Sequence, residues 1–152
     1  MTQNKQLEQK ATEINDLLTE QIAVNDELFR FSVRKAIPLP FIFKKIDYSL
    51  LHDRATRSLE QAQSVAQSLE EMEDNVAEGD EQFYRALREY HNSLTHIFDC
   101  LVMMLDKLKR KAAGEYDYPH RYYQQDVEEY ERVKEHCYKL GEQLQQQYEL
   151  VS

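Results

Sequence analysis

The sequence has little glycine, proline or cysteine and no tryptophan: its 152 residues include three Gly, three Pro and two Cys. Collagen-like and Pro/Gly-rich disordered chains need far more Gly and Pro, so both classes are excluded. Two Cys cannot staple a chain of this length, which excludes a disulfide scaffold. The turn residues and alternating Val/Ile/Thr runs of an all-β fold are missing. No stretch of about 18–20 residues lacks charge, so no transmembrane helix is expected.

Acidic residues outnumber basic ones by 28 to 19, which gives a net charge of −9. This balance argues against a protein that coats nucleic acid over its whole surface, because neutralising phosphates needs clustered Lys and Arg. The N-terminal segment MTQNKQLEQKATEIND has no apolar core of the kind that a signal peptide carries. We therefore expect a cytoplasmic protein in which Cys100 and Cys137 are reduced thiols.

The few Gly and Pro residues mark three connections between long helical patterns. We predict one helical domain over residues 1–152, with an apolar and basic, Pro-containing connection at 36–45. The predicted helices cover the ranges 4–35, 46–77, 80–113 and 119–149.

Apolar residues follow the spacing of a coiled-coil seam in these helices. The third helix has the longest series, which is Phe83, Leu87, Tyr90, Leu94, Ile97, Leu101, Met104 and Leu108. The first helix has a series of Leu7, Ala11, Ile14, Leu18, Ile22 and Leu28. Helices joined by short loops pack antiparallel, so the sequence predicts an all-α, up-down-up-down four-helix bundle. The variant is a three-helix bundle with the first helix swung out by the stiff connection.

The predicted topology gives the bundle one basic and one acidic end. Residues 28–46 contain five bases and no acid, and residues 107–111 contain four more bases. In an up-down bundle the first and third connections lie at the same end, so both basic segments meet there. The connection at the other end, within 70–81, carries seven acids and no base.

The basic end is also rich in Phe and Tyr, and apolar groups surrounded by Lys and Arg suit an anionic or amphipathic partner. We therefore predict a non-enzymatic interaction module or adaptor without a cofactor, with a protein partner or a second copy as the expected ligand. Peripheral binding to an anionic membrane through the same end is the alternative, and nucleic acid is not expected. A purely structural explanation is that Lys and Arg favour helix C-termini and that 36–45 covers the core. The predicted binding residues are Arg34, Lys35, Phe41, Phe43, Lys44, Lys45, Lys109 and Arg110.

Two further constellations could carry chemistry. His96, Cys100, His136 and Cys137 fall at one height of the predicted bundle and have the ligand types of a tetrahedral zinc site. However, adjacent residues on a helix point about 100° apart, and Cys137 fits the core seam, so we predict no metal.

The third helix also contains Arg85 and His91, spaced R-x5-H. This pair resembles the Arg…His motif of the helical HEPN ribonucleases, in which the two residues act on a phosphodiester and dimerisation joins two copies. Ala86 departs from that motif, where a polar residue follows the Arg. The resemblance implies a ribonuclease that uses Arg85 and His91 as the second alternative function.

Overall fold

A computed structural model describes the backbone of residues 3–34 and 46–151 and the side chains of residues 5–29 and 46–147. In these parts of the chain the structure has four long α-helices: α1 (Gln3–Arg34), α2 (Tyr48–Glu71), α3 (Glu81–Ala112) and α4 (His120–Val151). Two short 3-10 turns, η1 (Glu73–Asn75) and η2 (Glu78–Asp80), join α2 to α3. The all-α class is confirmed.

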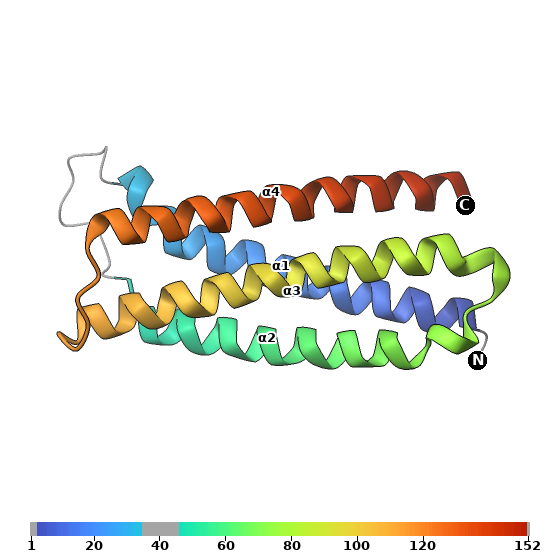
Figure 1. Ribbon diagram of the computed structural model, residues 1–152, viewed down its shortest axis with the longest axis horizontal. Helices are drawn as coiled ribbons and strands as arrows, with labels where there is room; N and C mark the ends of the chain where they lie inside the picture. Colours follow the sequence, from blue (N-terminus) through green and yellow to red (C-terminus); the bar gives the residue numbers. More distant parts are fainter. Residues whose placement is uncertain (1–2, 35–45, 152) are drawn as a thin grey trace.

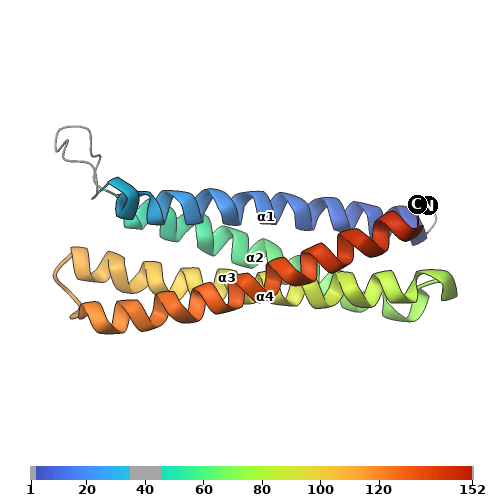
Figure 2. The ribbon, with the colours of Figure 1, turned by 90° about the horizontal axis from the view of Figure 1, so that it is seen from above.

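The helices alternate in direction along the bundle, as the sequence predicts (Figure 1). The end of α1, the start of α2 and the connection between α3 and α4 lie at one end, whereas η1 and η2 lie at the other (Figure 1). α1 packs along α2 and α3, so the arrangement is the four-helix bundle and not the variant with a swung-out first helix. Seen from above, α4 is inclined to α1 and α3 (Figure 2).

The helix ends follow local sequence signals. The Asp47 side chain caps α2 by accepting a hydrogen bond from the backbone N–H of Leu50 at 3.0 Å, which satisfies one of the unpaired donors of the first turn. α3 ends in a Schellman motif, in which the N–H of Glu115 donates to the carbonyl of Arg110 at 2.9 Å. Gly114 holds the left-handed position of that motif with a φ of +75°, a conformation that glycine adopts without steric cost.

The predicted range of the second helix was too long at its C-terminal end, because α2 ends at Glu71 and not at residue 77. Acids crowd this end, and negative charge is unfavourable next to the carbonyl end of the helix dipole. The chain turns instead through η1, and Val76 adopts an extended conformation with a ψ of 128°. Val76 then packs partly buried against the core.

α3 supplies the centre of the core. Eleven of its residues are buried, and the interior of the predicted seam, from Leu87 to Met104, is among them. α2 faces α3 mainly with small or medium side chains, which are Leu51, Ala55, Ser58, Ala62, Val65 and Leu69. The prediction of a heptad seam along the third helix is confirmed.

The core face of α1 differs from the prediction. The buried residues of this helix are Leu7, Ile14, Leu17, Gln21, Val24 and Leu28. Of the predicted seam, Ala11 and Leu18 are only half-buried, and the side chain of Ile22 is 41% exposed. The sequence pattern misled because a fully buried glutamine, Gln21, occupies a core position that apolar periodicity does not count.

Gln21 belongs to a hydrogen-bond network that joins α1 to α4. The Gln21 amide Nε2 donates to the Tyr130 hydroxyl at 2.9 Å, and the Tyr130 hydroxyl donates to Asn25 Oδ1 at 2.6 Å. The Tyr138 hydroxyl donates to Gln21 Oε1 at 2.9 Å. Gln21 and Tyr130 are fully buried, so these bonds fix the register between the two helices, because a shifted register leaves buried polar atoms unpaired.

Candidate functional site

The first candidate site is the end of the bundle where the sequence places both basic segments. Five of the eight predicted binding residues lie outside the described residues: Lys35, Phe41, Phe43, Lys44 and Lys45. Arg34 is the last residue of α1, beyond the described side chains of that helix. Lys109 and Arg110 lie in the last turn of α3, at the same end of the bundle as the end of α1 (Figure 1).

Two of the lysines at this end hold the α3–α4 connection. Lys107 Nζ lies 2.8 Å from Asp126 Oδ2, and the hydroxyl of the buried Tyr118 donates to the same carboxylate oxygen. Lys111 Nζ donates to the Tyr118 carbonyl at 3.0 Å. Burial and the carboxylate of Asp126 both raise the pKa of the Tyr118 hydroxyl. Lys107 and Lys111 are thus used inside the protein, and their charges are only partly available to a ligand.

Two arginines of this end, Arg110 and Arg121, lie on exposed tyrosines. The Arg110 guanidinium lies 4.9 Å from the ring centre of Tyr116 and 3.8 Å from Asp106. The Arg121 guanidinium lies 4.7 Å from the ring centre of Tyr122. Such pairs are weak at exposed sites, so the arginines can exchange these contacts for a partner's carboxylate. The end therefore presents cations beside aromatic rings.

The opposite end of the bundle carries the acidic connection. Acids surround η1 and η2, namely Glu70, Glu71, Glu73, Asp74, Glu78, Asp80 and Glu81. Arg88 of α3 reaches back to Glu73 at 3.3 Å, and the Tyr84 hydroxyl donates to the Leu69 carbonyl. Most of the seven acids are exposed, so this end keeps a strong negative charge.

The second candidate site is a groove of about 940 Å³ between α1, α3 and α4. One wall is the outer apolar face of α1, with Ala11, Leu18 and Ile22. The opposite wall is the last third of α4, and Phe83, Leu87 and Tyr90 of α3 also line the groove. The sequence did not predict this groove, because apolar periodicity places all apolar residues of the first helix in one core seam.

Gly141 allows α3 and α4 to approach closely at this groove. A Cβ atom added at Gly141 would lie 3.0 Å from Cε2 of Tyr90, which is closer than side chains normally tolerate. Glycine costs about 1 kcal/mol relative to alanine inside a helix, and the contact with the Tyr90 ring gives the reason for it here. The only glycine within a predicted helix thus marks a wall of the groove.

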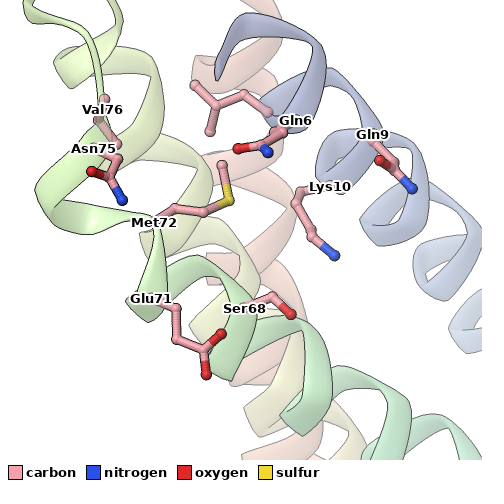
Figure 3. A pocket seen from close by; sticks show the side chains of 9 residues that line it. Gln6, Gln9, Lys10, Ser68, Glu71, Met72, Asn75 and Val76 are labelled. Carbon is pink, nitrogen blue, oxygen red and sulfur yellow. The ribbon is translucent and has the colours of Figure 1, made fainter. Parts of the chain in front are cut away.

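A smaller hollow of about 420 Å³ lies between the start of α1 and the end of α2. Figure 3 shows Met72 in its centre, with Gln6 and Lys10 on one side and Glu71 and Ser68 on the other. Lys10 is already paired with Glu13 at 3.0 Å. The lining mixes amides with both signs of charge and does not converge on one kind of ligand.

The Arg…His pair does not form a joint site. Arg85 is exposed, whereas His91 is fully buried between α3 and α2, with Nε2 2.7 Å from the Ala62 carbonyl oxygen. Burial lowers the pKa of His91, although its hydrogen bond to Ala62 opposes this. In this arrangement His91 cannot reach a phosphodiester, so the geometry gives the ribonuclease hypothesis no support.

The four His and Cys residues do not assemble a metal site either. His96 and His136 are exposed, whereas Cys100 and Cys137 are buried free thiols. Across residues 3–34 and 46–151, no three His, Cys, Asp or Glu side chains are grouped so that they could hold a metal ion. The two cysteines behave as small core residues.

Both thiols are expected to be inert in the native protein. Burial raises the pKa of Cys100 to about 11 and, separately, that of Cys137 to about 11, and the thiolate is the reactive form. At pH 8 a thiol reagent such as 5,5′-dithiobis(2-nitrobenzoate) should label neither cysteine quickly in the folded protein and both in denaturant. Rapid labelling of the native protein, followed by absorbance, would contradict this placement.

Comparison with protein-family models, curated proteins and solved structures finds no match for this chain. No helix within the described ranges combines the length and apolar character needed to cross a bilayer.

Proposed function

We propose that this protein is a helical interaction module whose basic, aromatic end binds an anionic or amphipathic segment of a partner protein. In this proposal the end of α3 and the start of α4 supply Lys109, Arg110 and Arg121, and residues 30–45 supply further cations and aromatic rings. The long bundle serves as a rigid support for that end.

One observation carries the proposal: the topology separates the charges along the molecule. The helix ends flanking residues 35–45 and the basic turn of α3 lie at one end, and the acidic connection lies at the other (Figure 1). A concentrated positive field attracts and orients an anionic partner, even when the whole protein is negative. The exposed rings of Tyr116 and Tyr122 add apolar contact area beside the cations, which suits a segment that is both acidic and apolar.

Charge reversal at the basic end tests the proposal. The variant Lys44→Glu/Lys45→Glu/Arg110→Glu should bind a labelled acidic amphipathic peptide, with Leu at helical spacing and Glu elsewhere, at least about tenfold more weakly than wild type. The physical reason is loss of attraction and gain of repulsion, so wild-type binding should also weaken as salt rises. Fluorescence anisotropy of the peptide measures both effects.

A matched control carries the same charge change elsewhere. Arg85→Glu/Lys139→Glu/Arg57→Glu alters three exposed bases outside the basic end and should bind the peptide as wild type does. Equal weakening by both variants would show a response to net charge alone and would contradict the proposal. Binding to phosphatidylserine vesicles without binding to the peptide would assign the same end to a membrane surface instead.

A further inference from the structure

α1 carries two apolar faces, and the bundle buries the first fully but covers the second only in part. The core face runs from Leu7 to Leu28 through Gln21. The second face, Ala11, Leu18 and Ile22, borders the groove between α1, α3 and α4. These three residues repeat at intervals of seven and four, which places them in one line along the helix.

Side chains bridge the gap between α1 and α4 at one point, and the gap is open beyond that point. The hydrogen bonds of Gln21 to Tyr130 and Tyr138 span the gap between α1 and α4. Beyond them, toward the start of α1, the groove lies between the α1 line on one side and Gly141 and Leu144 on the other. The α1 line from Ala11 to Ile22 is about 16 Å long, which matches roughly three turns of a helix.

The charge of the groove has one sign. Its lining contains two ionisable acids, Glu8 and Glu142, and no base. The groove lies toward the end of the bundle that carries the acidic connection, because the start of α1 and the end of α4 lie there (Figure 2). A ligand for this groove therefore has an apolar face and cationic flanks.

We infer that the groove binds an amphipathic helix of a partner protein, with apolar residues at helical spacing and Lys or Arg beside them. Helix-in-groove recognition uses anchors at i, i+3, i+4 and i+7, and the line of Ala11, Leu18 and Ile22 offers complementary contacts at that spacing. On the α4 wall, Gly141 lets the Tyr90 ring of α3 pack close against α4. This surface is distinct from the basic end and selects the opposite charge.

The test uses the lack of tryptophan in the protein. A basic amphipathic peptide, with Leu and one Trp on its apolar face and Lys elsewhere, is titrated with the full chain. Its fluorescence should shift to shorter wavelength as the Trp enters the groove, against no Trp background. Binding should weaken at least tenfold in Ile22→Arg, which places a cation and removes an apolar contact in the groove.

Leu50→Arg is the matched control, because Leu50 is 53% exposed on α2 and does not line the groove. It should bind the peptide as wild type does. Ile22 is itself 41% exposed, so both variants should keep the wild-type circular dichroism. A second test reverses the charge of the groove in the double variant Glu8→Lys/Glu142→Lys. Its control is Glu60→Lys/Glu128→Lys, which makes the same charge change outside the groove. Only the groove variant should bind the peptide more weakly and with a smaller dependence on salt.

Three results would overturn the inference. The first is the absence of a Trp shift at any peptide concentration that keeps the peptide soluble. The second is an equal loss of binding in Ile22→Arg and Leu50→Arg. The third is a wild-type dimer in sedimentation equilibrium that Ile22→Arg dissociates and Leu50→Arg does not, because a second copy would then occupy the groove.

Discussion

Replacing Tyr130 with alanine should lower the free energy of unfolding by about 3–5 kcal/mol, the range for removing a large buried aromatic side chain. The ring is fully buried and stacks on Phe29 with the ring centres 5.7 Å apart. The substitution removes this packing and also leaves the buried Gln21 amide without the hydroxyl that accepts its hydrogen bond. Urea denaturation followed by circular dichroism measures the change.

Tyr130→Phe separates the hydroxyl from the ring. It keeps the packing and leaves Gln21 Nε2 and Asn25 Oδ1 without this partner, which should cost about 1–3 kcal/mol. The control is Tyr122→Ala, on the same helix but with its side chain 45% exposed, which should change stability by less than about 1 kcal/mol. Similar losses in Tyr130→Ala and Tyr122→Ala would contradict the packing of α1 on α4 through this residue.

The helices were predictable because the apolar periodicity and the local helix-end signals indicate the same elements. The α3 seam repeats without interruption, and Asp47, Gly114 and Pro119 mark helix ends by local chemistry that does not depend on the rest of the fold. The end of α2 was not predictable in the same way. The pattern of apolar residues continues to Val76, and only the competition between the acids and the helix dipole stops the helix earlier.

The candidate sites depend on tertiary contacts, which the sequence reports indirectly. Apolar periodicity alone cannot assign Ile22 to a groove, because an apolar residue looks the same in the sequence whether it faces the core or the groove. A signal was present in the second series, in which Ile14, Leu17, Gln21, Val24 and Leu28 keep the heptad spacing if one glutamine is allowed. The sequence also cannot show burial, so the R-x5-H spacing made His91 a catalytic candidate although its ring is buried against the Ala62 carbonyl.

The basic end and the groove lie at different places on the bundle and favour ligands of opposite charge. The basic end favours an acidic segment, and the groove favours a basic amphipathic helix, so the two cannot compete for one ligand. If both proposals hold, a single molecule joins two partners of opposite charge. The length of the bundle then sets the distance between them, and the Gln21–Tyr130 network keeps α1 in the register that forms the groove wall.

Acidification should destabilise the protein through His91. Its imidazole is fully buried, Nε2 is engaged with the Ala62 carbonyl, and Nδ1 has no hydrogen-bond partner among the described residues. Burial lowers its pKa in the folded state, so the unfolded chain binds a proton more readily than the folded one. Stability from this group is present above the unfolded pKa, near 6.5, and is lost as the pH falls below it, with a slope of up to about 1.4 kcal/mol per pH unit.

The comparison of His91→Gln with His136→Gln isolates this residue from the carboxylates that also titrate in acid. Glutamine keeps an N–H donor but cannot be protonated, so His91→Gln should show a flatter dependence of unfolding free energy on pH between 7.5 and 5, measured by urea denaturation. His136 is exposed, and its substitution should leave the wild-type slope unchanged. Parallel curves for wild type and His91→Gln would mean that His91 is accessible to protons in the folded state. The α2–α3 interface would then be open around it, which contradicts the closed core on which the groove and both ends of the bundle depend.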